Sequence, residues 1–428
     1  MNKIGNLFKG DKGIWTVFLF LCLISIVEVF SASSTLTYKS QNYLSPLIYH
    51  CGTILMGLLV AIVTLNIPCR YFKLITPLML LLSYATLFGV LAFGQSINGA
   101  NRVIQLPGFT FQPSEIAKGT MVLFTAQILS ALQREDGSGA NPLAMKYILW
   151  VTLPAVVLIG VENLSTAVIL FAVIYTMMIL GRMPWKQMGK LTLAGAICAA
   201  LFLALVFSVG GMDKEAEQEL ADMKAGVKTE QLKKDKEDRS WVEKLTHRFG
   251  TWRNRLVGIM DGSEDPEDPN EYEITDKNFQ VTHANIAIAS SGVIGKGPGN
   301  SVERDYLPQA FSDFIYAIII EEMGIAGAIL VVFLYVTLLF RGARIARRCE
   351  NNFPAYLVMG LVLLLVYQAI INMAVAVDFG IVTGQPLPLV SKGGTSTIVN
   401  CAYIGAILSV SKSAKRVGQP QKQIPTEV

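Results

Sequence analysis

Long apolar runs separated by short polar loops dominate the sequence of this 428-residue chain. A membrane-spanning helix needs about 20 mainly apolar residues, and runs of about this length recur along most of the chain. The pattern therefore predicts an all-α polytopic membrane protein with ten transmembrane helices. The predicted helices cover residues 14–33, 46–67, 72–94, 113–133, 144–161, 164–182, 190–210, 314–340, 354–377 and 395–411.

The positive charges between these runs predict which helix ends face the cytoplasm. Lys and Arg are frequent before the first run, in every second loop and after the last run. The alternate short loops carry few bases, chiefly Lys39, Arg102 and Lys392. Because cytoplasmic loops of membrane proteins are enriched in Lys and Arg, both chain termini are predicted to be cytoplasmic.

The seventh and eighth runs are separated by a long polar segment, which predicts a large extracytoplasmic loop at residues 211–313. Residues 213–313 contain 21 acidic and 14 basic residues, whereas the rest of the chain contains 11 acidic and 22 basic residues. The stretch 213–247 has the pattern of a charged, partly amphipathic helix, which is either a solvated spacer or a partner surface. We therefore expect a single transmembrane domain over residues 1–412 that includes this loop, followed by a cytoplasmic tail at residues 413–428.

Composition narrows the class of protein. Hydrophobic residues make up 52% of the chain and charged residues 16%, whereas soluble domains carry about 25% charged residues. This balance argues against a soluble enzyme, a disordered protein and a nucleic-acid-binding protein. The six cysteines show no C-x-x-C spacing and the three histidines are far apart, which argues against a disulfide framework and a zinc site.

Ionisable residues inside predicted spans are the first candidates for function, because burying them in a membrane is costly. Glu115 and Lys118 stand at the head of the fourth run, three residues apart, so they share a helix face and can pair. They either fix this helix to its neighbours or line a polar substrate cavity.

Asp313 stands at the outer start of the eighth run, and Glu321 and Glu322 follow within it. The spacing of positions 313, 317 and 321 predicts that they share one helix face. A partly desolvated carboxylate at this boundary can work as a general base. The alternative is that Ser312 or Asp313 caps the N-terminus of the helix.

Two glycine-rich loops are predicted on the same side of the membrane. The glycines of GVIGKGPGNS (292–301) either let backbone N–H groups surround a phosphate or form a plain flexible loop. The prolines and glycines of TGQPLPLVSKGGTS (383–396) exclude a regular helix. A non-helical stretch at membrane depth must be buried in protein or line a wet cavity.

Four ordered motifs in these loops carry a family resemblance. They are NGANRVIQLPGFTFQPSEIAK (98–118), FQVTHANIAIASSGVIGKGPGNS (279–301), YLPQAFSDFIYAIIIEEMG (306–324) and TGQPLPLVSKGGTS (383–396). They resemble the motifs of the SEDS family, the RodA- and FtsW-type proteins of bacterial wall synthesis. The resemblance covers most of residues 13–412.

The resemblance implies a processive peptidoglycan glycosyltransferase that polymerises lipid II at the outer face of the bacterial cytoplasmic membrane, with undecaprenyl diphosphate as leaving group. The catalytic Asp of the family falls on Asp313, whose implied role is general base toward the acceptor sugar 4-hydroxyl. Cationic side chains or a divalent ion, Mg²⁺ or Mn²⁺, must balance the leaving diphosphate. The implied substrate-binding residues are Arg102, Gln112, Glu115, Lys118, Lys296, Asp305 and Lys392.

The chain departs from the family motifs at several positions next to these residues. An added lysine beside the glycines of the last motif offers a further charge for diphosphate binding. The departures are Val103 for Trp, Gln309 for Glu, Phe311 for His, Ser312 for Thr and Lys392 for Tyr. The P-D-L-G-T-A motif of the family reads E-N-L-S-T-A at residues 162–167, so its Asp is missing.

The motifs resemble the FtsW type more than the RodA type, which implies septal wall synthesis in cell division. Expected partners are a class B penicillin-binding protein, which crosslinks the new strand, other division proteins and membrane lipids. Three alternatives remain: an elongation-type polymerase, a lipid II flippase and a non-catalytic scaffold. A flippase predicts polar residues across the whole bilayer and inverted repeats, whereas the polar positions here cluster on the outer side.

Overall fold

The computed structural model describes residues 9–32, 45–93, 95–97, 100–106, 109–135, 138–209, 250, 279–307, 310–380 and 384–414. The charged stretch 213–247 and most of the predicted tail lie outside the described residues. The chain divides into two compact units. The first unit comprises residues 1–184, 283–378 and 383–428, and the second comprises residues 185–282 and 379–382.

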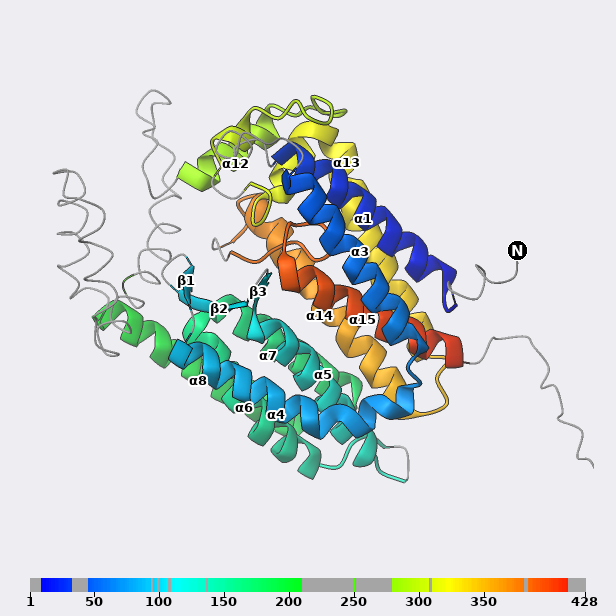
Figure 1. The fold of residues 1–428 in the computed structure, drawn as a ribbon. Helices are drawn as coiled ribbons and strands as arrows, with labels where there is room; N and C mark the ends of the chain where they lie inside the picture. Colours follow the sequence, from blue (N-terminus) through cyan, green and yellow to red (C-terminus); the bar gives the residue numbers. More distant parts are fainter. Residues whose placement is uncertain are drawn as a thin grey trace, which may run out of the picture. The chain divides into compact units, whose positions relative to one another are not determined.

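The first unit is a bundle of long apolar helices (Figure 1). Its elements in the first half of the chain are α1 (Lys12–Ala32), α3 (Ser45–Asn66), α4 (Cys69–Phe93), α5 (Pro113–Ala131), α6 (Leu143–Glu162) and α7 (Leu164–Leu180). Those in the second half are the 3₁₀ turn η3 (Glu303–Asp305), α13 (Ile315–Ala346), α14 (Asn352–Ala376) and α15 (Gly394–Ser413). The helix α12 spans Phe279–Ala289, and its residues from His283 onward belong to this unit.

Helix α14 forms the centre of the first unit (Figure 1). It packs against α5, α7, α13 and α15, while α3 runs along α15 and α1 along α13. Most residues of α14 are buried, whereas α3 and α4 leave one apolar face exposed. An exposed apolar face on a helix of this length is suited to contact lipid. In the second unit, α8 (Trp185–Val209) is likewise long, apolar and largely exposed.

Among the described residues, eight helices are long and apolar enough to cross a membrane. Together they make this a polytopic helical membrane protein. They correspond to eight of the predicted spans; the other two predicted spans are α5 and α7. Helix α5 contains the charged residues Glu115 and Lys118, and α7 is only 17 residues long.

A small antiparallel sheet departs from the all-α expectation. The strands β1 (Gln95–Ile97), β2 (Ala100–Leu106) and β3 (Phe109–Phe111) pair in the order β1-β2-β3 between α4 and α5. Val103 pairs with Gln95, and Leu106 pairs with Phe109. The sheet leads directly into the predicted helix start at Pro113, where α5 begins.

Helix α13 is broken at Gly324, whose φ of 69° is not helical. The break removes the partners of the Glu321 and Glu322 backbone carbonyls within the helix. The glycine-rich loop supplies them instead, because the N–H groups of Lys296 and Gly297 donate to these carbonyls at 2.9 and 2.8 Å. The break therefore creates a docking point for the loop at residues 292–301.

Candidate active site

The segment of residues 384–393 between α14 and α15, here called the 384–393 loop, is buried in the protein although it is not helical. The sequence predicted that such a stretch must be buried or line a wet cavity. Leu387, Leu389 and Val390 are enclosed by the bundle, and Leu389 has a positive φ of 67°. This loop therefore needs hydrogen-bond partners for its backbone.

Side chains from three helices supply partners for the loop backbone. Asn372 of α14 donates to the carbonyl of Gln385 at 2.7 Å, and Gln368 of α14 donates to that of Pro386 at 3.0 Å. Tyr335 of α13 donates to the Pro388 carbonyl, and Ser25 of α1 donates to that of Val390. The Gln385 side chain donates to Asn163 and Thr166 at the start of α7. The loop is thus held in one position by long-range contacts.

The Ser25 hydroxyl also determines that one particular ring nitrogen of a buried histidine carries a hydrogen. It lies 2.8 Å from Nε2 of His50 in α3. Because its only hydrogen points to the Val390 carbonyl, Ser25 must accept from His50, so Nε2 of His50 carries a hydrogen. This chain of contacts ties α3 and α1 to the 384–393 loop.

The 384–393 loop holds the segment that contains Asp313. Three successive carbonyls of this segment accept hydrogen bonds: Phe311 from the Lys392 N–H at 2.9 Å, Ser312 from the Ser391 hydroxyl at 2.6 Å, and Asp313 from the Asn372 amide at 2.8 Å. The backbone of Asp313 is therefore fixed from two directions.

The carboxylate of Asp313 accepts a hydrogen bond from the Ser312 hydroxyl at 2.9 Å and is partly accessible. Helix α13 begins at Ile315 with Phe314 at the N-cap, so the prediction that Ser312 or Asp313 is the cap residue is wrong. The predicted shared face of positions 313, 317 and 321 also fails, because Asp313 precedes the helix. A turn rather than a helix sets the direction of this carboxylate.

Glu115 and Lys118 form a buried ion pair in α5, with 2.9 Å between Nζ of Lys118 and Oε1 of Glu115. The lysine ammonium also donates to Oε1 of Gln368 at 3.0 Å. Oε2 of Glu115 has no hydrogen-bond partner within the described part of the chain. The pair thus joins α5 to α14 through Gln368.

Gln368 and Asn372 are the residues that sequence reasoning missed. Each is about 1% exposed, and they lie one turn apart on α14, so they share a face. Gln368 contacts Lys118, and Asn372 contacts the Asp313 carbonyl. Two polar residues at i,i+4 spacing in an otherwise apolar run were the available signal. This polar stripe connects the two predicted parts of the site.

Lys392 lies beside the Asp313 segment. Its ammonium is 4.9 Å from the centre of the Phe311 ring. Burial lowers the pKa of Lys392 below the ordinary value of a lysine, because desolvation disfavours the charged form.

At the start of α5, the backbone N–H of Gln112 donates to the Thr395 hydroxyl at 3.2 Å. This contact brings Gln112 to the end of the 384–393 loop.

The glycine-rich loop at 292–301 docks onto Glu321 and Glu322, which are both fully buried. The N–H groups of Val302 and Glu303 donate to Glu321, and those of Gly299 and Ser301 donate to Glu322. These backbone N–H groups, which the sequence analysis considered for phosphate binding, therefore bind the protein's own carboxylates.

The other three predicted binding residues belong to other elements of the structure. Lys296 forms an ion pair with Glu321 at 2.6 Å. Asp305 belongs to η3 and its side chain is 52% exposed. The backbone of Arg102 lies in β2, but its side chain is outside the described part of the structure. The structure thus brings together Gln112, Glu115, Lys118, Asp313 and Lys392.

The described residues contain no preformed cluster of metal ligands. Within the described ranges, no three His, Cys, Asp or Glu side chains gather closely enough to hold a metal ion. The described carboxylates of Glu321 and Glu322 are already engaged by backbone N–H groups and bases.

The fold and the site are those of a polytopic helical membrane protein that holds a partly accessible carboxylate at the start of one helix. The sequence profile of the FtsW/RodA/SpoVE family of cell cycle proteins matches residues 11–214 and 243–416. The chain belongs to this family.

Two relatives match nearly the whole chain. It is 29% identical over 424 residues to the probable peptidoglycan glycosyltransferase FtsW of Halomonas elongata, covering 96% of this chain and 93% of the relative. It is 25% identical over 411 residues to the peptidoglycan glycosyltransferase MrdB of Escherichia coli, covering 96% and 95%.

Solved structures share the fold. A chain of a peptidoglycan synthase complex, reported for its coordination of polymerization and crosslinking, superposes with a TM-score of 0.66 at 23% identity, covering 95% of this chain and 98% of that chain. The rod shape determining protein RodA of Thermus thermophilus superposes with a TM-score of 0.61 at 20% identity, covering 96% and 99%.

Proposed function

We propose that this protein is a peptidoglycan glycosyltransferase that polymerises lipid II into glycan strands for septal wall synthesis. Family membership and the names of the relatives support the activity. The observation that carries the proposal is the Asp313 segment, whose three carbonyls are held by the 384–393 loop and Asn372. Reactions of this kind need a base held in a fixed position.

The proposed membrane arrangement has ten spans in one domain over residues 1–412. The eight long apolar helices account for eight spans, and α5 and α7 supply the other two inside the bundle, where neighbouring helices cover them. The distribution of Lys and Arg places both termini in the cytoplasm. Asp313 then faces the outside of the bacterial cytoplasmic membrane.

In the proposed reaction, Asp313 removes the proton from the 4-hydroxyl of the acceptor sugar. The hydroxyl oxygen attacks the anomeric carbon of the donor, and the bond from that carbon to the diphosphate oxygen breaks. Undecaprenyl diphosphate leaves and the configuration is inverted. The Ser312 hydroxyl, which donates to Asp313 at 2.9 Å, orients the carboxylate for this transfer.

The leaving diphosphate gains negative charge, which positive groups must stabilise. Lys392 belongs to the loop that holds Asp313, and Lys118 contacts Gln368, which donates to the same loop. We assign this role first to these two lysines. Lys296 and Arg102 are further candidates in the same role, and Gln112, Glu115 and Asp305 are proposed to orient the substrate. A divalent ion, Mg²⁺ or Mn²⁺, bound together with the diphosphate is the alternative source of charge.

The proposed partner is a class B penicillin-binding protein that crosslinks the new strand, together with other division proteins. The structural likeness to a chain of a peptidoglycan synthase complex supports such a partner. Resemblance to FtsW proteins supports the septal role over the elongation role. A fluorescent fusion concentrated at midcell would agree with the septal role, and one along the side wall would contradict it.

Labelled lipid II, given to the purified protein with its transpeptidase partner, tests the activity. We expect glycan strands from the wild type and a loss of roughly 100-fold or more in Asp313→Asn, because a positioned base contributes about 10²–10⁴ in rate. Glu135→Gln is the matched control, since Glu135 is exposed in the loop between α5 and α6. Unchanged polymerisation by Asp313→Asn would overturn the assignment of the base.

The same material separates the polymerase from a flippase. Lipid II reconstituted in liposomes reports transfer between leaflets independently of polymer formation. Transfer without any polymer from well-folded wild type would favour a transporter. Neither transfer nor polymer in the presence of the partner would favour a scaffold.

A further inference from the structure

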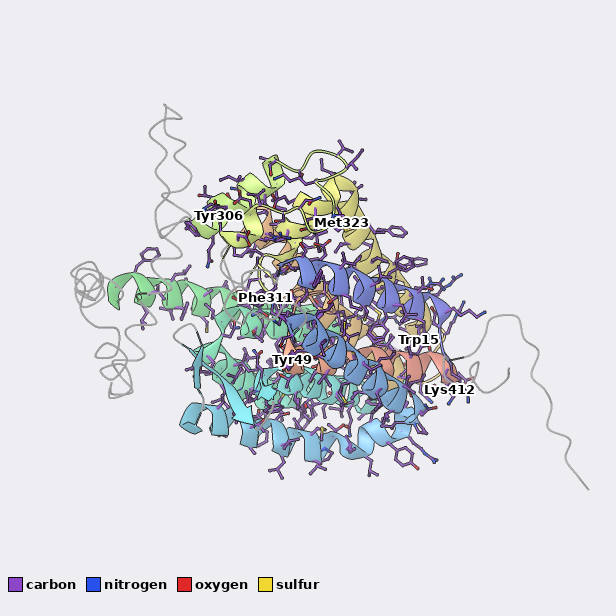
Figure 2. All side chains as sticks on the ribbon, turned by 45° about the horizontal axis from the view of Figure 1, so that its top comes forward. Trp15, Tyr49, Tyr306, Phe311, Met323 and Lys412 are labelled. Carbon is purple, nitrogen blue, oxygen red and sulfur yellow. The ribbon has the colours of Figure 1, made fainter. Side chains whose placement is uncertain are left out.

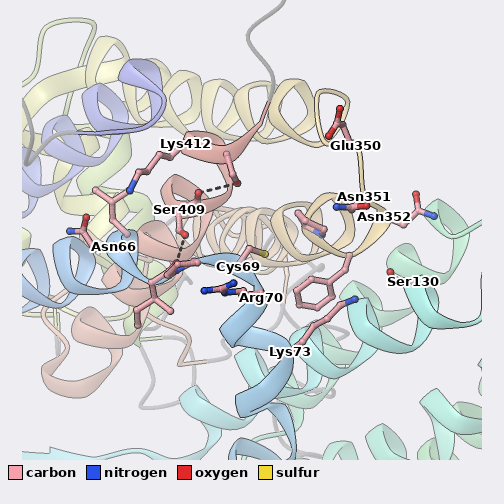
Figure 3. Close-up of a pocket in the computed structure, with 16 residues that line it drawn as sticks. Asn66, Cys69, Arg70, Lys73, Ser130, Glu350, Asn351, Asn352, Ser409 and Lys412 are labelled. Carbon is pink, nitrogen blue, oxygen red and sulfur yellow. Dashed lines mark hydrogen bonds between the residues drawn. The ribbon is translucent and has the colours of Figure 1, made fainter. Parts of the chain in front are cut away.

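A pocket of about 910 Å³, here called the basic pocket, lies at the ends of α14 and α15 that are remote from the 384–393 loop. Figure 3 shows the side chains that line it. The ends of α3 and α15 and the starts of α4 and α14 form its walls. The charged, polar and aromatic residues of its lining that matter here are Arg70, Lys73, Glu350, Asn351, Phe353 and Lys412. The distribution of Lys and Arg assigns this end of the helices to the cytoplasm.

The basic pocket carries an excess of positive charge. Arg70, Lys73 and Lys412 line it together with one carboxylate, Glu350. No ion pair joins any of the three bases to a carboxylate within the described part of the chain. Figure 3 shows these bases on different walls, with Arg70 and Lys73 from α4 and Lys412 from α15.

Aromatic side chains hold two of these bases in place. The Lys73 ammonium lies 5.0 Å from the centre of the Phe353 ring, and the Arg70 guanidinium lies 4.9 Å from that of Tyr71. Contacts of this kind orient a cation without neutralising it. The charges therefore remain available to an anion.

The start of α14 adds a further positive contribution. Its N-cap residue Asn351 lines the basic pocket and makes no side-chain capping hydrogen bond. The first N–H groups of a helix have no partner within the helix, and the N-terminus is the positive end of its dipole. A phosphate in the pocket would receive the N–H groups of Asn352 and Phe353 in addition to the three side-chain charges, whereas Pro354 has no N–H to offer.

An apolar stripe leads from the pocket along the outside of α4. Arg70, Leu74, Leu78 and Leu81 follow one another at helical spacing, and the three leucines are 76%, 58% and 69% exposed. This is the arrangement that a lipid requires, with charges for the phosphate and an exposed apolar surface for the acyl chains. A soluble phosphate compound would make no use of the stripe.

We propose that the basic pocket binds the phosphate headgroup of an anionic phospholipid of the cytoplasmic leaflet. Arg70, Lys73 and Lys412 contact the phosphate, and the acyl chains lie along the exposed leucines of α4. This site is separate from the Asp313 segment and does not depend on the proposed catalytic activity.

Native mass spectrometry of the full-length protein in detergent tests the site, with phosphatidylglycerol and phosphatidylcholine as probes. We expect phosphatidylglycerol to remain bound and phosphatidylcholine to dissociate. The combined variant Arg70→Gln, Lys73→Gln, Lys412→Gln should bind phosphatidylglycerol roughly 100-fold more weakly, since each base near a membrane surface contributes about 1 kcal/mol and about 1.4 kcal/mol corresponds to tenfold.

The matched control removes three exposed bases from the same end of the helices but outside the pocket: Lys146→Gln, Arg344→Gln, Arg347→Gln. It should bind phosphatidylglycerol within about threefold of the wild type, because charge outside a pocket is screened. Equal losses in both variants would overturn the pocket in favour of general surface charge. Circular dichroism shows whether each variant is folded. If a combined variant is unfolded, its three single substitutions are measured in its place.

Competition distinguishes the sources of the anion. Inorganic phosphate and glycerol phosphate should displace the lipid only at far higher concentrations than phosphatidylglycerol itself, because they lack acyl chains. Equal displacement would overturn the lipid in favour of a soluble phosphate compound. Stronger displacement by a poly-glutamate peptide would overturn it in favour of an acidic protein segment.

Discussion

The ammonium group of Lys392 lies over the ring of Phe311, 4.9 Å from its centre, and the Lys392 backbone N–H donates to the Phe311 carbonyl at 2.9 Å. In Figure 2, Phe311 lies near the middle of the view, and Lys412 lies well separated from it at the end of α15. The SEDS motifs that the sequence resembles have Tyr and His at these two positions. The two departures therefore contact each other, and the aromatic face stabilises an ammonium group that is partly desolvated.

Replacing Lys392 by methionine should weaken substrate binding. If the ammonium contacts the diphosphate, Lys392→Met raises KM for lipid II roughly tenfold, because a charge-assisted hydrogen bond contributes about 1.5–3 kcal/mol. Steady-state polymerisation kinetics measure the change. Lys146→Met, at the opposite end of the helices, is the control. An unchanged KM for Lys392→Met removes this residue from the substrate site.

The lowered pKa of Lys392 predicts a pH effect on binding. Its ammonium loses its proton at a lower pH than an ordinary lysine. In this alkaline range the folded protein thus binds fewer protons than the unfolded chain, so the contribution of Lys392 to folding stability rises with pH. The affinity for the diphosphate falls over the same range, because the neutral amine no longer attracts it. KM of the wild type should increase with pH there. In Lys392→Arg it should stay flat, because guanidinium keeps its charge. Identical pH profiles would contradict the assignment.

Breaking the Glu115–Lys118 ion pair should destabilise the protein strongly. Lys118→Met leaves a buried carboxylate without its counter-charge, which costs about 3–5 kcal/mol. The double variant Glu115→Gln, Lys118→Met should recover most of this loss. Thermal unfolding in detergent measures both.

The Asp11–Arg341 pair provides the comparison for this test. Its atoms are 3.5 Å apart and the arginine side chain is 35% exposed, so Arg341→Gln should cost less than about 1 kcal/mol. If Lys118→Met is no less stable than Arg341→Gln, the buried pair is not coupled as described.

Replacing Asn372 should slow the reaction without weakening substrate binding. Asn372→Leu keeps the number and branching of the side-chain heavy atoms but removes the donor to the Asp313 and Gln385 carbonyls. A shift of about 1 Å in a catalytic group costs on the order of 100-fold in rate, so we expect kcat to fall about 10- to 100-fold. KM should stay within about twofold, which separates positioning from general damage. Asn352→Leu, at the exposed start of the same helix, is the control.

The docking of the glycine-rich loop predicts unequal effects of two glycine substitutions. A Cβ on Gly295, whose φ is 84°, would lie 2.3 Å from the Glu322 carbonyl oxygen, whereas one on Gly292, whose φ is 64°, would meet open space. Gly292→Ala carries only backbone strain of about 1 kcal/mol. Gly295→Ala should lower the unfolding temperature clearly further. Equal shifts would show that the loop does not dock at the α13 break.

The apolar runs predicted the helices well, because length and composition suffice to select a helix that can cross a membrane. Pro113 marked the start of α5, where the missing N–H of proline is tolerated. The same runs did not reveal the break at Gly324, since a single glycine inside an apolar helix is common in membranes. The strands between α4 and α5 were also missed, because their pairing partners are short and irregular.

The candidate residues were predicted less completely. Asp313, Glu115 and Lys118 stood out as charges in apolar surroundings, but the sequence placed Asp313 on the face of a helix that begins two residues later. Gln368 and Asn372 are uncharged and lie within the most buried helix, so neither charge nor loop position marked them. Their role depends on contacts with residues more than 50 positions away.

Local composition and spacing along the chain were enough to predict the membrane class, the approximate helix limits, the charge asymmetry and the chemical groups available. Which of these groups meet depends on contacts between residues that are far apart in the sequence. The buried 384–393 loop must satisfy its backbone from other helices, and this requirement brings Asn372, Gln368 and Lys118 together around the segment of Asp313. The same requirement at the α13 break directs the glycine-rich loop to Glu321 and Glu322 instead of to a ligand.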